Sequence, residues 1–311
     1  MQPPSLFLAF SMQNILLFGA TGNLGRQIAK SAVKRGFTVT AVVRNEKRKT
    51  VLKDVTANVV VCDVGNAYLP AGTCQGFDIV ISALGKSVSP NDHSKASFRQ
   101  IDLDANSNIL TDAVKCGVKK FIYISAFGAE HYPELDYFSV HHQFSEKLKA
   151  SGLDYAIIKP PALFSAFIDL AQMAKKGMLV TMGKGDKQTN PIYEGDLAQI
   201  CIDAIQQPNA VIEAGGKEVL TRHRINEIIQ QTIHPRKKVR KVPIGLVQAS
   251  LPLVNLFSKN MYDKLAFFIA VMQHDTLAPA VGETRLATYM AALAKGELAS
   301  LIAGKPSSVH V

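Results

Sequence analysis

The sequence predicts an α/β fold in which a doubly wound parallel sheet carries a small, mostly helical C-terminal lobe. The first observation is composition: 47% of the 311 residues are hydrophobic and 19% are charged, which is typical of a chain that buries a large core. The second is the alternation of short apolar runs with helical patterns, which indicates right-handed crossovers between parallel strands. The third is a glycine-rich loop between the first apolar run and the first helical pattern.

Six strands are predicted from short runs of apolar or β-branched residues. They span residues 14–18, 38–43, 59–62, 79–82, 120–124 and 155–158. Helical patterns separate several of these runs, at 24–33, 101–115 and 138–150, and Gly36 ends the first helix. A helix between successive strands lets each strand run in the same direction, so we expect one parallel sheet.

The second half of the chain is less regular. After Pro160 and Pro161 the sequence predicts helices at 163–176 and 196–205, a polar loop at 183–189, a short strand at 218–220 and a largely helical region from 222 onward. We therefore expect residues 13–160 to form the core. We expect residues 161–311 to supply the remaining sheet elements and a lid lobe of the same domain.

Two apolar segments are relevant to whether the protein is secreted or associated with a membrane. Residues 1–12 lack the basic start of a secretory signal, and Met12 directly precedes the first strand, so a dispensable N-terminal extension is predicted. No apolar stretch reaches the roughly 20 residues that a membrane-spanning helix needs. The apolar stretch 246–272 favours a helical lid or a dimer face over peripheral membrane contact.

The charges and cysteines exclude several classes of site. The net charge is +10, but the densest basic run, 236–241, has no interleaved aromatic residue. It therefore favours a solvated loop or strand edge, and no nucleic-acid partner is expected. The four cysteines have no metal-like or C-x-x-C spacing, so we expect no metal site and reduced thiols in a cytoplasmic protein.

The loop from Gly19 to Gly25 has the spacing of a dinucleotide-binding fingerprint. In such a loop Gly19 would permit the tight turn, Gly22 would let the backbone approach a pyrophosphate, and Gly25 would allow close strand–helix packing. The N-terminus of the following helix would offer free N–H groups to the phosphates. The loop lies where this fingerprint must lie, after a strand and before a helix.

Residues after the next strands indicate which dinucleotide is bound. Arg44 follows the second strand, at the position where an acidic residue would select NAD. Its planar donor fork suits the 2′-phosphate of NADPH, and Lys47 and Arg48 add positive charge nearby. Asp63 could accept a hydrogen bond from adenine, and the small residues at 82–85 would leave room for the cofactor to cross the sheet edge.

Several stretches together resemble one family, the atypical short-chain dehydrogenases/reductases in their NmrA-like, NAD(P)-binding branch. The matching stretches are 19–25, 43–44, 63–64, 82–85, 102–108, 117–125, 151–160, 190–198, 215–216 and 241–245. The later stretches are similar to divinyl chlorophyllide reductase-like proteins. The resemblance covers roughly residues 13 to 295 and implies a Rossmann-like fold with the nicotinamide near the ends of the fourth to sixth strands.

The resemblance also implies roles for individual residues. Arg44 takes the 2′-phosphate role, and Asp63 with Val64 takes the adenine role. The remaining cofactor-binding residues form the phosphate loop and the backbone wall along the nicotinamide ribose: Gly19, Thr21, Gly22, Asn23, Leu24, Gly25, Ser82, Ala83 and Leu84.

Classical members of the superfamily use a serine and a Tyr-x-x-x-Lys pair, and this chain departs from that pattern. Ser125 stands at the serine position, and Tyr137 and His141 have the spacing of one helix face. His141 falls about where the family has lysine, with His142 one position away. Neutral histidine does not supply the constant charge of lysine, although it can donate to a ribose hydroxyl or act as acid or base.

Two functions therefore stay open at this point. The first is an NADPH-dependent oxidoreductase that acts on a small apolar substrate, with Tyr137, His141 and Ser125 as catalytic residues. The second is a non-catalytic NADPH-binding protein, a redox sensor or assembly protein of the NmrA-like type, which the missing lysine favours. The sequence identifies neither the substrate nor the oligomeric state.

Overall fold

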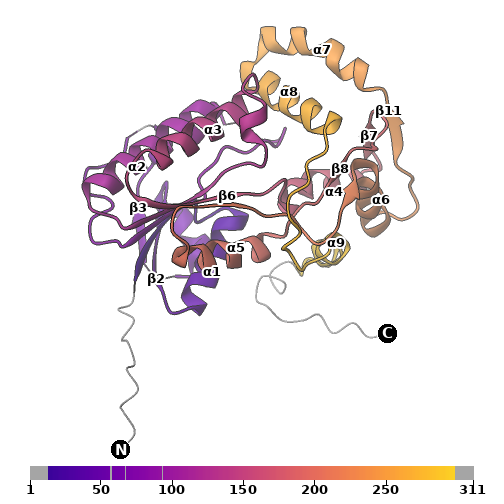
Figure 1. Cartoon of the computed structure of the whole chain (residues 1–311). Coiled ribbons are helices and arrows are strands. Elements are labelled where there is room, and N and C mark those ends of the chain that lie inside the picture. The colour runs from indigo at the N-terminus through magenta and orange to yellow at the C-terminus, as the bar shows by residue number, and fades with distance from the viewer. Residues whose placement is uncertain (1–12, 57, 67, 93, 298–311) are drawn as a thin grey trace, which may run out of the picture.

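The computed structural model describes residues 13–297 apart from 57, 67 and 93, so the predicted extension 1–12 lies outside the described residues. Its centre is a seven-stranded parallel sheet with the strand order β3-β2-β1-β4-β5-β6-β9 (Figure 1). The strands are β1 (Asn14–Phe18), β2 (Thr38–Val43), β3 (Asn58–Val61), β4 (Ile79–Ser82), β5 (Lys120–Ile124), β6 (Asp154–Lys159) and β9 (Ala210–Glu213). The predicted doubly wound fold is confirmed.

Helices cover both faces of the sheet (Figure 1). One face carries α1 (Asn23–Lys34) and α5 (Glu194–Asp203), and the other carries α2 (Asn106–Lys115) and α3 (Asp136–Lys149). The strand β1 shows why its apolar run is continuous. Ile15 and Leu17 belong to the core under α1 and α5, whereas Leu16 and Phe18 belong to the core under α2 and α3. A strand buried on both faces reads as unbroken apolar sequence.

The elements of the structure differ from the sequence predictions in several places. Strand β9 was not predicted, because it is an edge strand whose residues alternate between half-buried and exposed and end in a glutamate. The predicted helix 101–115 begins as a π-helical segment, Arg99–Ala105, before α2. The predicted polar loop 183–189 ends in a short strand, β8 (Gln188–Thr189), which pairs with β10 (Leu220–Thr221).

The C-terminal lobe has a smaller core of its own. Helices α4 (Ile168–Lys175), α6 (Arg222–Ile233) and α9 (Leu286–Lys295) surround it. Beside it β7 (Val180–Met182) pairs in parallel with β11 (Arg240–Val242), which is the end of the basic run. Helices α7 (Ile244–Phe257) and α8 (Lys259–Gln273) then form an antiparallel hairpin, in which α8 packs next to one end of α3 (Figure 1).

Candidate dinucleotide site

The three glycines of the loop have different tasks. Gly19 has a φ of +74°, and a Cβ there would lie 2.3 Å from the carbonyl oxygen of Ala83. A Cβ on Gly25 would lie 2.2 Å from the carbonyl oxygen of Gly19. Both glycines are therefore required by the close approach of backbone to backbone. A Cβ on Gly22 would meet only the Gly19 oxygen, at 3.4 Å, so this residue faces open space in which a ligand can lie.

The N-terminus of α1 is suited to an anion. Gly22 caps the helix without a side-chain hydrogen bond, and the first turn contains no acidic residue. The first N–H groups of the helix thus keep their donor capacity for phosphate oxygens. Thr21 is half-buried and Asn23 is exposed, so both can contact a ligand, whereas the Leu24 side chain is buried in the core beneath the sheet. A contact from Leu24 would have to come from its backbone.

Arg44 and Asp63 follow two neighbouring strands at the same edge of the sheet. The register of β2 and β3 pairs Val43 with Val61, so both chains leave the sheet together. Arg44 is exposed and makes no ion pair with any described residue. The Asp63 carboxylate accepts the backbone N–H of Gly65 at 3.2 Å, and Val64 is buried. Arg44 therefore has an unpaired guanidinium at the edge where ligands of such sheets bind.

The segment after β4 forms a wall next to the glycine loop. The backbone N–H of Ala83 donates to the Phe18 carbonyl at 3.1 Å, which continues the sheet to its edge. The buried Ser82 hydroxyl donates to Oδ1 of Asn106 at 2.6 Å, so its role is to fix this wall from behind. Ala83 and Leu84 are partly exposed and present their surface to the site.

The predicted catalytic pair lies at the start of α3. The ring of Tyr137 lies against the His141 imidazole, with 4.7 Å between centroids, and against Phe267 of α8, at 4.4 Å. His141 is buried. Its Nδ1 is 2.6 Å from the hydroxyl of Tyr123 on β5, and its Nε2 is 3.6 Å from Oδ1 of Asp102. Sequence reasoning missed Tyr123, and its only signal was a hydroxyl within an apolar strand.

Burial keeps this cluster uncharged near neutral pH. Desolvation raises the pKa of the Asp102 carboxyl to about 8 and lowers the pKa of His141 to about 4. It also raises the pKa of Tyr137 above its usual value, with a smaller contribution from the Asp102 charge. The cluster therefore contains a neutral imidazole and a phenol that keeps its proton.

Ser125 follows strand β5 and lies near α3, but it does not contact the Tyr137–His141 pair directly. Its hydroxyl is 3.2 Å from that of Ser145, which in turn donates to the His141 carbonyl at 2.7 Å. Ser125 lines a cavity of about 140 Å³ together with His142 and the Glu130–Lys159 ion pair. Of the two histidines, His142 shares a cavity with Ser125, and His141 contacts Tyr137.

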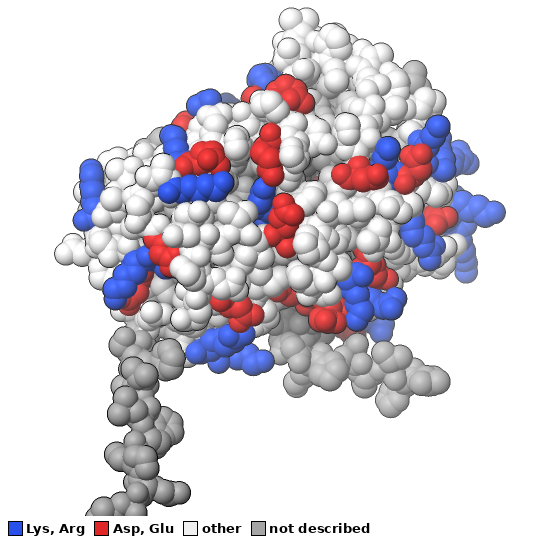
Figure 2. Space-filling view, viewed as in Figure 1, with Lys and Arg blue, Asp and Glu red and all other residues white. Residues whose placement is uncertain are grey.

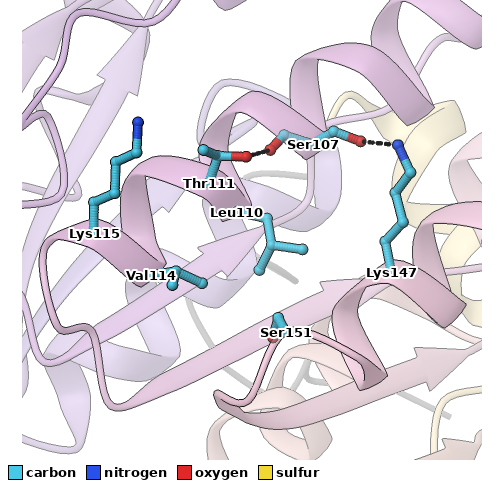
Figure 3. A pocket seen from close by; sticks show the side chains of 7 residues that line it. All are labelled: Ser107, Leu110, Thr111, Val114, Lys115, Lys147 and Ser151. Carbon is cyan, nitrogen blue, oxygen red and sulfur yellow. Dashed lines mark hydrogen bonds between the residues drawn. The ribbon is translucent and has the colours of Figure 1, made fainter.

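A larger hollow of about 360 Å³ lies on the outer faces of α2 and α3 (Figure 3). Its lining includes Leu110 and Val114, and Lys147 donates to the Ser107 hydroxyl across it at 3.2 Å. None of the predicted site residues lines it. We therefore do not assign chemistry to this hollow.

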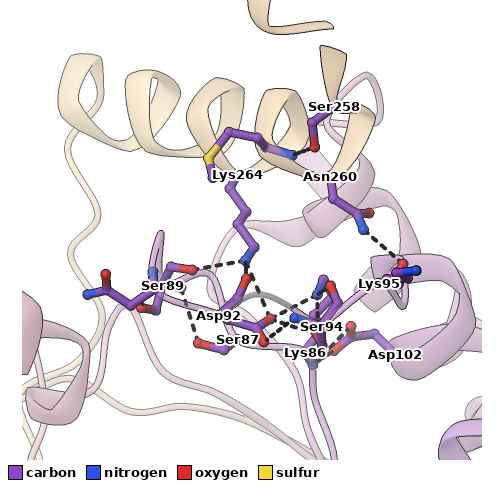
Figure 4. Close-up of polar contacts among 12 residues, drawn as sticks. Lys86, Ser87, Ser89, Asp92, Ser94, Lys95, Asp102, Ser258, Asn260 and Lys264 are labelled. Atoms are coloured by element: carbon purple, nitrogen blue, oxygen red, sulfur yellow. Dashed lines mark hydrogen bonds and ion pairs between the residues drawn. The ribbon is translucent and has the colours of Figure 1, made fainter.

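A buried ionic cluster joins the wall after β4 to helix α8 (Figure 4). Lys86 and Lys264 both donate to Oδ2 of Asp92, at 2.9 and 3.4 Å, and their side chains are only 2% and 4% exposed. The Lys264 ammonium also donates to the carbonyls of Ser89 and Asp92, and Lys86 also donates to Ser94. No sequence pattern predicts this cluster, because its members are up to 178 positions apart.

Among the described residues, no group of His, Cys, Asp or Glu side chains could hold a metal ion. The described part of the chain also contains no helix long and apolar enough to cross a membrane. The four cysteines are free thiols.

The fold and this edge of the sheet define a dinucleotide-binding protein of the Rossmann type. The NAD(P)H-binding family profile matches residues 19–208. The chain belongs to this NAD(P)H-binding family, within the NmrA-like branch of the atypical short-chain dehydrogenases/reductases.

Two curated relatives represent different kinds of protein. The divinyl chlorophyllide a 8-vinyl-reductase of Arabidopsis thaliana is 30% identical over 270 residues, which cover 79% of this chain and 64% of the relative. The photosystem II assembly factor Ycf39 of Cyanophora paradoxa is 27% identical, over 82% of this chain and 80% of the relative. The chain thus spans less than two thirds of the reductase.

Solved structures share the fold. The NADPH-dependent quinone oxidoreductase QOR2 of Escherichia coli, in complex with NADPH, has a TM-score of 0.68 at 19% identity, covering 90% of this chain and 99% of its own. The triphenylmethane reductase of Citrobacter sp., in complex with NADP(H), has a TM-score of 0.67 at 17% identity, with the same coverage. At this identity the likeness shows the fold alone.

Proposed function

We propose that this protein is an NADPH-dependent reductase of a small apolar substrate. The observation that carries the proposal is the position of Tyr137. By its sequence motif Tyr137 corresponds to the catalytic tyrosine of the superfamily, and its surroundings are aromatic, with Phe98, Phe138 and Phe267 in ring contact. Such surroundings suit an apolar substrate, and Tyr137 is the proton donor that a reduction needs.

The residues around Tyr137 keep its phenol protonated near neutral pH, so in this step the phenol can serve as a proton donor but not as a base. The imidazole of His141 is neutral because burial lowers its pKa to about 4, so no fixed positive charge stabilises a phenolate. Burial also raises the pKa of Tyr137, so the phenol holds its proton until a substrate takes it. Bound NADPH would supply the hydride, and Tyr137 would deliver the proton to the same substrate. Ser125 lines a separate cavity with His142, so the predicted catalytic role of Ser125 has no contact with Tyr137 to support it.

Arg44 supports NADPH over NADH. The guanidinium has no ion pair with a described residue, and it stands where an acid would bind the ribose hydroxyls of NAD. Asp63 and Val64, one strand further along the same edge, are the proposed adenine contacts. We therefore propose two ligands, a dinucleotide and a small-molecule substrate, and no nucleic-acid partner. We also propose that the protein is cytoplasmic.

The alternative is a protein that binds NADPH without turnover. Two observations favour it: a buried, uncharged histidine stands where the superfamily has lysine, and Ycf39, an assembly factor, is among the relatives. In this alternative the Tyr137–His141 contact is part of the packing between α3 and α8.

Anaerobic stopped-flow measurements separate the two functions. The protein loaded with NADPH is mixed with quinones, enones and aldehydes, and NADPH absorbance is followed. We expect oxidation by at least one apolar acceptor, and Tyr137→Phe should slow it by roughly 10²–10⁴, the usual contribution of general acid catalysis. The control is Tyr155→Phe, at the opposite end of β6 from the site.

The NADPH affinity of the Tyr137→Phe protein should equal that of the parent, because the ring and its packing stay in place. If no acceptor oxidises NADPH, or if Tyr137→Phe reacts as fast as the parent, the binding protein without turnover is the correct description.

A further inference from the structure

Helix α7 is largely apolar and is poorly covered by the rest of the protein. Its 14 residues, IGLVQASLPLVNLF, include no charged side chain, and none of its described side chains is buried. Leu256 and Phe257 are 78% and 79% exposed, and Leu253 is 61% exposed. The helix packs chiefly against α8 and forms the outer edge of the molecule (Figure 1). A helix of this composition normally lies in a core or in a membrane.

The chain next to α7 is basic. Its exposed cations make no ion pair with any described residue: Arg236, Lys237, Lys238, Arg240 and Lys241. The Lys237 side chain lies beside Gly177, so the exposed Lys175 and Lys176 join the same surface. No Asp or Glu occurs from residue 228 to residue 262. In Figure 2 the surface over α7 is white, and Lys and Arg side chains lie beside it, over β7 and β11, with some Asp and Glu side chains among them.

We propose that α7 and the basic segment 236–241 dock this protein onto an anionic membrane surface. A helix of 14 residues is about 21 Å long, which is shorter than the roughly 30 Å hydrocarbon core. It therefore lies in the headgroup region with Leu253, Leu256 and Phe257 inserted, and the cations contact lipid phosphates. The exposure of α7 at the outer edge of the molecule thus argues against the lid, one of the two alternatives that the sequence favoured.

Charge argues against a second copy of the chain as the cover. The basic segment of a second copy carries the same charge, and residues 228–262 offer it no acidic partner, whereas anionic lipids supply the opposite charge. Insertion in a membrane keeps α8 in place, since Lys264 and Phe267 hold its inner side against the wall after β4 and against Tyr137. The docking proposal does not depend on whether Tyr137 is catalytic.

Vesicle flotation of the full chain tests the proposal. We expect the parent to float with vesicles that contain phosphatidylglycerol and phosphatidylcholine, and to stay behind with phosphatidylcholine alone. Leu256→Glu combined with Phe257→Glu should weaken binding at least about tenfold. Lys237→Gln, Lys238→Gln and Arg240→Gln together should weaken it roughly hundredfold, since each cation near an anionic surface changes affinity about fivefold.

Matched controls change the same chemistry elsewhere. Val33→Glu with Val114→Glu replaces two exposed apolar residues on other helices, and Lys34→Gln, Lys53→Gln and Lys115→Gln removes the same charge. Both controls should float like the parent. The proposal is wrong if the parent does not float with anionic vesicles, or if the Leu256/Phe257 variant floats as well as the parent. It is also wrong if light scattering shows a parent dimer that this variant converts to a monomer.

Discussion

At the scale of single residues, Arg44 is the residue that we propose distinguishes the two nicotinamide cofactors. It follows the end of β2, is exposed, and forms no ion pair with any described residue. A charge-assisted hydrogen bond is typically worth ~1.5–3 kcal/mol, so Arg44→Ala should weaken NADPH binding about tenfold or more. NADH affinity should stay nearly unchanged, because NADH has no 2′-phosphate. Calorimetry with both cofactors measures this, and Lys53→Ala, on the loop before β3, is the control.

Equal losses of NADH and NADPH affinity in Arg44→Ala would contradict the assigned role. So would equal affinities of the two cofactors for the parent protein, because the 2′-phosphate would then contribute nothing.

Asp102 couples folding to pH. Its pKa of about 8 in the folded protein lies above the ordinary 3.8, so between these values the folded state holds a proton that the unfolded chain has released. The free energy of unfolding contributed by Asp102 therefore falls as pH rises through this window. His141 has the opposite sign, since its pKa is lowered from 6.5 to about 4, and its contribution increases from pH 4 to 6.5.

Above pH 6.5, Asp102 is the only one of these two residues that should still make the free energy of unfolding depend on pH. We therefore expect the parent to lose stability between pH 6.5 and 8, and Asp102→Asn to lose less, as measured by urea unfolding at both values. The Asn side chain can still accept the Lys86 N–H that Asp102 accepts at 3.2 Å. An identical pH dependence in both proteins would show that Asp102 is ionised throughout this range.

At the scale of elements, the turn from β1 to α1 contains one glycine that we expect to be needed for cofactor binding and another that is needed for folding. A side chain at Gly22 would project into open space, whereas one at Gly25 would strike the Gly19 carbonyl at 2.2 Å. Gly22→Val should therefore leave the fold intact and abolish binding of NADPH and NADH. Gly25→Val should lower the melting temperature as well, because the backbone of the turn must move.

Circular dichroism and calorimetry together check this pair of variants. Retained cofactor binding in a folded Gly22→Val protein would place the pyrophosphate elsewhere. A Gly25→Val protein as stable as the parent would show that the backbone of the turn can move without lowering the free energy of unfolding.

At the scale of the whole molecule, the Lys86–Asp92–Lys264 cluster attaches the α7–α8 hairpin to the sheet. Lys264→Met would leave the carbonyls of Ser89 and Asp92 without this donor and remove one cation from the Asp92 carboxylate. Breaking a buried pair in this way typically costs ~3–5 kcal/mol of unfolding free energy.

The control for Lys264→Met is Lys149→Met, which breaks the exposed pair with Glu146 and should cost less than ~1 kcal/mol. Urea unfolding of both variants gives the comparison. Equal costs would mean that the hairpin is attached by its apolar contacts alone.

The sequence alone determined the parts of this protein that local pattern controls. Six strands of the central sheet, the glycine loop and the position of Arg44 all follow from period and spacing within about 30 residues, because backbone geometry repeats over that range. The edge strand β9 was not predicted, because its alternation of half-buried and exposed residues is a weak strand signal. Its place in the sheet depends on pairing with β6.

Which side chains meet depends on the tertiary structure. Asp102, Tyr123 and His141 come from three different elements, and Lys264 reaches a carboxylate 172 positions earlier. Such contacts, and the pKa values that burial imposes on them, depend on how helices pack on the sheet, which no local period encodes. The exposure of α7 belongs here too: its sequence reads as a helix that should be buried, and the fold leaves it on the surface.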